Sequence, residues 1–483
     1  MQGRAEKIVK TAGIAIFWLL VWQLLALVFH NSILLSGPLE VLIYLKQHIL
    51  TASFWKTVGN SFFHIFTGFA FSFIAGFFMG ILSAKYHFLE SLLSPFLQFV
   101  KAVPVASFVV LLLIFIGSAK LSVSVTFLMV LPIIYQNVLE GVKNTDRSLL
   151  EMAQVFRMPL WNRIFFIYRP SLMPFLISGS KVALGMSFKA GVAAEVIGTP
   201  DFSIGERIYM SKIFLDTAGL FSWTFVVILI SFLFERIFLG LLVLVGNAQI
   251  KAVSLKTGQG KQAGISKDGI EKNKVKSREG GRDIIVEDMA KYYSGKKVFC
   301  NLSQVFEGGG IYAVMGGSGC GKTTLFRILL GLTDYDKGNL RIPKGRCGVV
   351  FQEDRLCIGV TPVKNVSMAA KKGRTEEEIR QMLLEILPEE CLDQETGKLS
   401  GGMKRRTAIA RAMLGGGEWL LLDEPFTGLD EETKKKTIAF ILKYRNGRTM
   451  LVATHQKEEV EQLSAVLVTW DRMVDERYGK QGK

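Results

Sequence analysis

With 483 residues, the chain is longer than one ordinary domain, so two or three domains are expected. It is 49% hydrophobic and contains 35 Phe residues, which exclude a purely soluble enzyme and indicate membrane segments. The net charge is +16, but the basic residues flank apolar runs or fall in a linker. This pattern favours the cytoplasmic side of a membrane protein over a nucleic-acid partner.

Six apolar runs predict an all-α membrane domain with six spans. Basic residues precede the first run, residues 11–29, so the N-terminus is expected in the cytoplasm and the run is expected to remain as an anchor. The other runs lie near residues 57–83, 91–117, 121–138, 172–194 and 221–246. Lys101 and two prolines interrupt the third run. Six spans are still expected, because an even number returns the chain to the cytoplasm.

A basic loop, residues 139–170, joins the fourth and fifth runs. The segment from Glu151 to Trp161 and the segment from Ile167 to Pro170 predict two short helices separated by a turn. Such a knob can dock on another domain, much as a helix lies in a groove. By itself, the loop could equally be an ordinary basic cytoplasmic connection.

The fifth run combines small residues with charged ones. Its glycines, alanines and serines predict close packing of helices. Lys181 and Lys189 lie within the apolar stretch, where a charge is expensive and commonly faces a cavity or a partner. Lys181 could instead extend towards the cytoplasm. Lys189 is the better candidate for a polar pathway, unless it pairs with Glu195.

A cationic, glycine-containing segment separates the apolar half from the rest of the chain. We predict a membrane domain over residues 1–248, a flexible basic linker over 249–282 and an α/β domain over 283–483. The linker charge could rest on anionic lipid headgroups, or the segment could simply be a solvated tether.

The first motif with a chemical role in the predicted α/β domain is a glycine-rich loop. The apolar run 311–315 predicts a buried strand, and the pattern from Lys322 onward predicts a helix. Between them lies G-x-x-x-x-G-K-T, in which glycines allow backbone N–H groups to turn towards phosphates. The helix N-terminus favours negative charge. Lys322 can reach the β- and γ-phosphates, and the Thr323 hydroxyl can ligate Mg²⁺.

A second apolar run, residues 419–422, ends in two carboxylates. Asp423 is placed to hold Mg²⁺, and Glu424 is placed to orient and deprotonate an attacking water. Upstream, Ser400-Gly401-Gly402 opens a basic helix, which is a second candidate for a phosphate-binding helix terminus.

These motifs, in this order, resemble the ATPase domain of ABC transporters over residues 283–475. The resemblance implies Walker A contacts to nucleotide from Gly316, Gly317, Ser318, Gly319, Cys320, Gly321, Lys322, Thr323 and Thr324. It also implies that Tyr293 stacks on adenine, Gln352 is the Q-loop glutamine that senses Mg²⁺, and His455 is the switch histidine. Ser400, Gly401 and Gly402 correspond to the signature motif, Asp423 and Glu424 to Walker B, and Asp430 to the D-loop. Met403 stands where the signature usually has glutamine.

The loop before the fifth run resembles the E-A-A loop of ABC importer permeases, with Glu151, Ala153 and Pro170 at the family's spacing. Arg157 replaces the family's glycine. The residues that follow resemble the nitrate, sulfonate and taurine branch of these permeases, in which permease and ATPase are usually separate chains. The resemblance implies coupling to the ATPase through Glu151, Ala153, Arg157 and Pro170.

Together these patterns predict an ATP-hydrolysing importer half-unit in a bacterial cytoplasmic membrane, with ATP and Mg²⁺ as cofactors. The expected partners are a second copy of the chain, an extracytoplasmic substrate-binding protein and the lipid bilayer, and not nucleic acid. The expected solute is small and anionic. One alternative is an ABC exporter, which needs no binding protein. The other is a membrane-anchored ATPase that transmits force or a signal.

Overall fold

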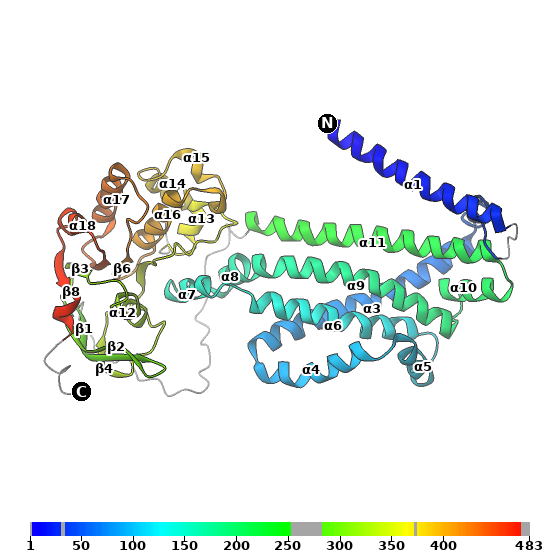
Figure 1. Cartoon of the computed structure of the whole chain (residues 1–483), viewed down its shortest axis with the longest axis horizontal. Helices are drawn as coiled ribbons and strands as arrows, with labels where there is room; N and C mark the ends of the chain where they lie inside the picture. The colour runs from blue at the N-terminus through cyan, green and yellow to red at the C-terminus, as the bar shows by residue number, and fades with distance from the viewer. Residues whose placement is uncertain (1, 30–33, 253–282, 371–373, 475–483) are drawn as a thin grey trace. The chain divides into compact units, whose positions relative to one another are not determined.

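The computed structural model describes residues 2–29, 34–252, 283–370 and 374–474, so most of the predicted linker lies outside the described residues. The chain divides into two compact units (Figure 1). The first comprises Met1–Asn144 and Ser171–Gln249, and the second comprises Thr145–Pro170 and Ile250–Lys483. The loop 145–170 therefore belongs to the second unit, although it interrupts the first in sequence.

The first unit is helical. Its helices are α1 (Gln2–Phe29), α2 (Pro38–His48), α3 (Ala52–Lys85), α4 (His87–Ala102), α5 (Val105–Ile116), α6 (Leu121–Lys143), α9 (Arg169–Gly198), α10 (Ile204–Ile213) and α11 (Thr217–Ala252). Long apolar sequences form the longest of these helices, α3, α9 and α11, and α9 contains Pro174 in its interior.

The helical membrane-type domain is confirmed, but the count of six spans is not. Among the described residues, four helices are long and apolar enough to cross a membrane: Ala52–Lys85, Leu121–Lys143, Leu160–Gly198 and Thr217–Gly246. The predicted third span is a pair of helices, α4 and α5, bent by 104°, and counting it as one span gives five. Pro104 caps α5 and forces Val103 into an extended conformation, which breaks the helix there. In the predicted first span, only Ile16–Val28 is an apolar helix, shorter than a span.

Small residues bring the helices of this unit close together. On α3, a Cβ added to Gly68 would lie 2.5 Å from the backbone oxygen of Val123, and one added to Gly80 would lie 2.8 Å from Val138. On α9, a Cβ at Gly191 would lie 2.6 Å from Ile65. The predicted close packing of the fifth run is therefore present at Gly191, although nothing approaches Gly185 within 4 Å.

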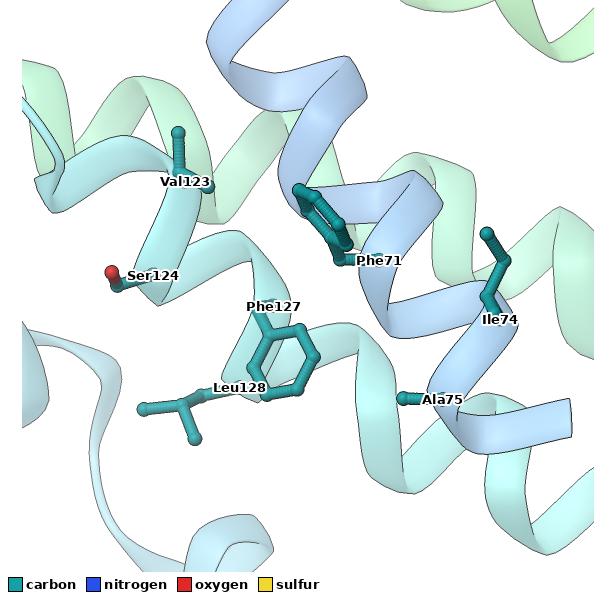
Figure 2. A pocket seen from close by; sticks show the side chains of 7 residues that line it. All are labelled: Phe71, Ile74, Ala75, Val123, Ser124, Phe127 and Leu128. Carbon is teal, nitrogen blue, oxygen red and sulfur yellow. The ribbon is translucent and has the colours of Figure 1, made fainter. Parts of the chain in front are cut away.

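An open groove lies on the surface formed by α3 and α6 (Figure 2). It is lined by Phe71, Ile74, Ala75, Val123, Ser124, Phe127 and Leu128. This lining is apolar except for the Ser124 hydroxyl, and it includes neither Lys181 nor Lys189. The groove therefore offers no charge that would recognise an anion.

The second unit contains two sheets. The strands are β1 (Ile284–Tyr293), β2 (Lys296–Phe306), β3 (Ile311–Met315), β4 (Lys337–Arg341), β5 (Cys347–Val350), β6 (Trp419–Asp423), β7 (Thr449–Ala453) and β8 (Val466–Thr469). An antiparallel sheet has the order β2-β1-β4, and a parallel sheet has the order β5-β6-β7-β3-β8. Every residue of β6 and β7 is buried, as expected for strands in the middle of a parallel sheet with both faces covered.

Helices and short turns complete this unit. They are α7 (Arg147–Val155), α8 (Leu160–Arg163), the π-helix η1 (Ile164–Tyr168), α12 (Lys322–Leu329), α13 (Pro362–Ser367), α14 (Glu376–Leu383), α15 (Glu389–Leu392), η3 (Thr396–Lys398), α16 (Gly401–Leu414), α17 (Glu431–Tyr444), α18 (Lys457–Gln462) and α19 (Trp470–Met473). Met152, Phe156 and Phe166 of the 145–170 loop are buried in the same apolar cluster as Val349 and Leu421 of the parallel sheet. The α/β prediction for this region is confirmed.

Candidate functional site

The carboxyl ends of three neighbouring strands bring the predicted phosphate site together. β3 ends at Met315 and leads into the glycine-rich loop, while β6 ends at Asp423. β7 lies between them, and its last residue, Ala453, pairs with both Asp423 and Val314. Loops that leave the carboxyl edge of a parallel sheet commonly hold ligands, because their backbone amides and side chains converge there.

The glycine-rich loop has the backbone that its sequence predicts. Gly319 and Gly321 have φ of 77° and 117°, in the region that side chains strain. A Cβ on Gly316 would lie 2.7 Å from the Cβ of Trp470, so this position also requires glycine. Lys322 begins α12, and its Nζ donates to the carbonyl oxygens of Gly316 and Gly317 at 2.8 and 3.0 Å. The ammonium is therefore held within the loop that is predicted to bind phosphate.

Thr323 and Asp423 are neighbours across this edge. The Asp423 carboxylate is buried and accepts a hydrogen bond from the Thr323 hydroxyl. Burial, followed by the charge of Glu424, raises the pKa of Asp423 to about 6, against the lowering effect of Thr323. A hydroxyl and a desolvated carboxylate beside a phosphate loop are suitable oxygen ligands for Mg²⁺, which usually takes few protein ligands. The two residues present therefore fit the predicted ion.

Glu424 and His455 also meet here. The Glu424 Oε1 lies 3.0 Å from the His455 Nε2, and the backbone N–H of Glu424 donates to Ala453 at 3.0 Å. Glu424 has a φ of 47°, a left-handed conformation that strains a residue other than glycine. An outlier of this kind at a candidate general base is typical of a preorganised site, because the surrounding structure must hold it.

The predicted signature and D-loop residues occupy helix N-termini. The Ser400 Oγ caps α16 by accepting from the Met403 N–H at 3.3 Å, and Gly401 has open space around it. Asp430 caps α17 by accepting from the Thr433 N–H at 3.0 Å. The hydrogen bond from the Thr433 N–H lowers the pKa of Asp430. Ser400 and Asp430 therefore each cap a helix of their own chain, and Ser400 and Gly401 are exposed.

Tyr293 and Gln352 are the remaining residues of the predicted nucleotide site. Tyr293 is the last residue of β1 and is half exposed, with the Lys291 Nζ 5.0 Å from the centre of its ring. Gln352 is an exposed residue in the segment that follows β5. Its backbone oxygen accepts from the Arg405 Nη1 at 3.3 Å. The structure thus leaves an accessible ring at Tyr293 and an accessible amide at Gln352.

Glu151 of the 145–170 loop forms an ion pair with two arginines. Its carboxylate accepts from Arg327 at 2.6 and 3.0 Å and from Arg355 at 2.7 Å. Arg327 lies on α12, which begins at Lys322, and Arg355 lies in the segment that begins at Gln352. Hydrogen bonding to Arg327, and then to Arg355, lowers the pKa of Glu151 against the effect of burial. A bidentate guanidinium contact is among the stronger charge pairs in proteins.

The backbone and contacts of Arg157 show why glycine suits this position and how the loop accommodates arginine instead. Arg157 has a φ of 49°, the conformation for which glycine is preferred, and it ends the first short helix. Its Nη2 donates to the carbonyl oxygen of Gly345 at 3.1 Å. Ala153 is fully buried, and its carbonyl oxygen accepts from Met158 and Arg163. Pro170 is the exposed second residue of α9.

The charged residues of α9 do not form the pair that we considered. Lys181 and Lys189 are exposed, whereas Glu195 is fully buried. The Glu195 Oε2 accepts from the Ser61 Oγ at 2.7 Å and from the Gly205 N–H at 3.2 Å. The alternative in which Glu195 serves as the partner of Lys189 is therefore wrong: Glu195 instead bonds α3 and the start of α10.

The sequence motifs do not indicate the arginines that join these segments. No motif contains Arg327 or Arg355, and Arg405 and Arg411 fall in the basic helix that Ser400-Gly401-Gly402 opens. Both Arg405 and Arg411 are buried, and the Arg411 guanidinium lies 5.1 Å from the ring of Phe156. Nothing in a single sequence separates a buried bridging arginine from a surface charge.

Comparisons with known proteins show which family the chain is similar to. Residues 299–427 match the family model described as ABC transporter, and residues 72–242 match the model described as binding-protein-dependent transport system inner membrane component. The aliphatic sulfonates import ATP-binding protein SsuB 1 of Pseudomonas savastanoi pv. phaseolicola is 35% identical over 185 residues, which cover 38% of this chain and 78% of that protein. The taurine import ATP-binding protein TauB of Escherichia coli O157:H7 is 33% identical over 194 residues, covering 36% and 74% respectively. A dimeric structure of a bacterial ABC transporter cassette is 24% identical, with 38% of this chain and 94% of that chain covered and a TM-score of 0.35.

Proposed function

Because the chain belongs to the ABC transporter family, with a permease and an ATPase fused in one polypeptide, we propose that it is one half of an ATP-driven importer. Two copies would form the working transporter. A separate extracytoplasmic protein would deliver a small anionic solute of the sulfonate, taurine or nitrate type. The membrane domain is proposed to span residues 1–248, the linker 249–282 and the ATPase domain 283–483, with the ATPase in the bacterial cytoplasm.

The observation that carries this proposal is the ion pair of Glu151 with Arg327 and Arg355. It connects a loop within the permease sequence to the helix that begins at Lys322 and to the segment that begins at Gln352. An importer must transmit changes at the nucleotide to its permease, and a charge-assisted contact between these segments supplies a defined path. The match to a binding-protein-dependent permease over residues 72–242 supports import over export.

The proposed chemistry is hydrolysis of ATP. Lys322 and the backbone of the glycine-rich loop would bind the phosphates, and Thr323 and Asp423 would hold Mg²⁺. When bound, the ion would neutralise phosphate charge. Glu424 would orient a water and accept its proton, and the 3.0 Å contact with His455 would keep the carboxylate in place. Tyr293 would stack on the adenine ring, and Ser400, Gly401, Gly402 and Asp430 would complete the site of the partner copy.

Uptake by reconstituted protein tests the proposal. The full chain would be placed in proteoliposomes that contain ATP and Mg²⁺, and labelled taurine, an alkyl sulfonate and nitrate would be offered with and without a candidate extracytoplasmic binding protein for that solute. We expect uptake of one of these solutes that requires both ATP and the binding protein, and that is lost in Glu424→Gln. ATP-dependent extrusion without a binding protein would favour an exporter, and ATP hydrolysis without movement of any solute would favour a force- or signal-transmitting ATPase.

A mixed dimer tests whether each site is shared between copies. One chain carries Lys322→Ala, its partner carries Ser400→Arg, and the two are purified together with different tags. A shared site leaves one of the two sites intact, so ATPase activity above that of the doubly substituted homodimer is expected. If the activity is at that background, crosslinking of cysteines introduced at Ser318 and Gly401 decides, and a product formed only within one chain would refute the shared site.

A further inference from the structure

Arg405 lies in α16, shortly after Ser400, and its guanidinium joins two segments of the proposed ATPase site. We propose that Arg405 is a positioning residue that transmits the docking of the 145–170 loop to the backbone of Glu424. This inference rests on the proposed function, because it concerns regulation of the same site.

The first observation is the set of acceptors that surround one buried side chain. Arg405 is 4% exposed. It donates to three successive carbonyl oxygens at the end of β6: those of Asp423 at 2.7 Å, Glu424 at 2.5 Å and Pro425 at 3.1 Å. One buried guanidinium thus binds three successive carbonyl oxygens, so it constrains the path of the chain through Glu424.

The second observation is that the same guanidinium holds the segment after β5. Its Nη1 donates to the carbonyl oxygens of Phe351 at 2.6 Å and Gln352 at 3.3 Å, and to the Oδ1 of Asp354 at 3.2 Å. A displacement of this segment must therefore either move Arg405 or break these bonds. A guanidinium is planar and rigid, so its two ends move together.

The third observation connects this segment to the loop. The Arg355 Nη1 donates to the Glu151 Oε2 at 2.7 Å, and the central carbon of the Arg355 guanidinium lies 4.0 Å from the centre of the Phe351 ring. Arg411, also on α16, donates to the carbonyl oxygens of Asp354 and Arg355 at 3.0 and 2.7 Å. The path from Glu151 to Glu424 is thus a continuous series of direct contacts through Arg355, the 351–355 segment and Arg405.

The strained backbone of Glu424 explains why such a path would have an effect. A left-handed φ of 47° persists only where neighbours hold it, and here the neighbours include Arg405 and the acceptor carbonyl of Ala453. If the 351–355 segment shifts, the Glu424 carbonyl loses its shortest hydrogen bond and keeps those from the Thr427 hydroxyl at 3.2 Å and the Thr427 N–H at 3.4 Å. The backbone is then less firmly held and can relax towards the right-handed region. The carboxylate would then leave the position in which it can act on water.

The test uses the full chain in lipid nanodiscs and compares Arg405→Lys with Arg448→Lys. Lysine keeps the charge but presents a single head, which cannot reach both segments. Arg448 is a matched control, because it donates to the carbonyl oxygens of Met413, Tyr444 and Arg445 and to none in the proposed site. We expect Arg405→Lys to lower kcat for ATP roughly 10- to 100-fold with KM nearly unchanged. Arg448→Lys should lower the melting temperature and leave kcat per folded protein within about twofold. Equal behaviour of the two variants would refute a positioning role.

A double-mutant cycle tests the transmission. Glu151→Gln removes the charge that holds Arg355, and in the wild-type background it should lower kcat by about fivefold or more. In the Arg405→Lys background the same substitution should have less than about a twofold effect, because the path is already broken. Independent effects that multiply, or no effect of Glu151→Gln in either background, would overturn the inference. If the wild-type chain hydrolyses no ATP at all, the proposed function fails instead, so the two failures are distinguishable.

Discussion

The two units of this protein hold their segments together by different means. In the unit that contains the parallel sheet, arginines connect loops: the buried Arg405 binds the segments after β5 and β6, and Glu151 joins Arg327 and Arg355. In the helical unit, close packing at glycines has this role: Gly68 lies against the backbone of Val123, and Gly191 lies against the side chain of Ile65. A change of charge should therefore disturb the unit with the parallel sheet most, and a change of volume should disturb the helical unit most.

The largest effect is expected at the proposed general base. Glu424→Gln keeps the shape of the side chain but removes its ability to accept a proton, so kcat for ATP should fall by roughly 10²- to 10⁴-fold. Binding of ATP, measured with a fluorescent analogue, should be retained, because no phosphate contact is lost. Lys322→Ala provides the contrast, since it should weaken nucleotide binding itself. Turnover close to normal in Glu424→Gln would show that Glu424 is not the general base.

Reversing a charge in the 145–170 loop should disconnect transport from the ATPase. Glu151→Lys places a third cation beside Arg327 and Arg355, so uptake should fall to background while ATP binding persists. Gln154→Lys is the control, because it adds the same charge on an exposed face of the same helix. Normal uptake in Glu151→Lys, or equal loss in both variants, would contradict the docking role.

The raised pKa of Asp423 predicts a pH effect on Mg²⁺ binding. Protonation below about pH 6 removes the charge that would hold the ion, so apparent affinity for Mg²⁺ should fall about tenfold per pH unit below that value. Titrations of Mg²⁺-dependent nucleotide binding between about pH 5.5 and 7.5 would measure it. Because the charge of Glu424 contributes to the raised pKa, Glu424→Gln should move the transition to lower pH. A flat profile in the wild type would contradict this assignment.

Volume should matter most in the helical unit. Gly68→Ala would place a methyl group 2.5 Å from the backbone oxygen of Val123, which cannot rotate away. The helices must separate, at a cost of about 1–3 kcal/mol in the free energy of unfolding. Gly59→Ala on the same helix is the control, since nothing lies within 4 Å of that position. Thermal unfolding in detergent should show a lower midpoint for Gly68→Ala alone.

The smallest effect is expected at Arg157, where strain and a contact oppose each other. Arg157→Gly should relieve about 1 kcal/mol of left-handed strain and lose a hydrogen bond to Gly345 of about 0.5–1.5 kcal/mol, with little net change. Arg157→Ala keeps the strain and loses the bond, so it should be less stable than Arg157→Gly by about 1 kcal/mol. Unfolding of the purified variants by denaturant would measure the difference, and the reverse order would be inconsistent with a strained turn.

Much of the sheet and its chemistry follows from local sequence. Buried strands such as residues 311–315 and 419–423 are continuous apolar runs, and the loops that follow them carry residues whose spacing predicts phosphate and Mg²⁺ contacts. The left-handed glycines at 319 and 321 are local requirements of one turn. For these reasons the membrane-plus-α/β architecture and the contact between Thr323 and Asp423 could be anticipated from the chain alone.

Only the tertiary structure decided what the charged side chains bind. The sequence offered Lys189 as a partner for Glu195, but the fold buries Glu195 against Ser61 and Gly205 and leaves Lys189 exposed. It likewise gave no sign that Arg405 joins residues 351–354 to residues 423–425. The apolar run at 91–117 became two helices bent by 104° rather than one straight span. Backbone preferences act over a few residues and are visible in sequence, whereas ion pairs join segments that meet only when the chain has folded.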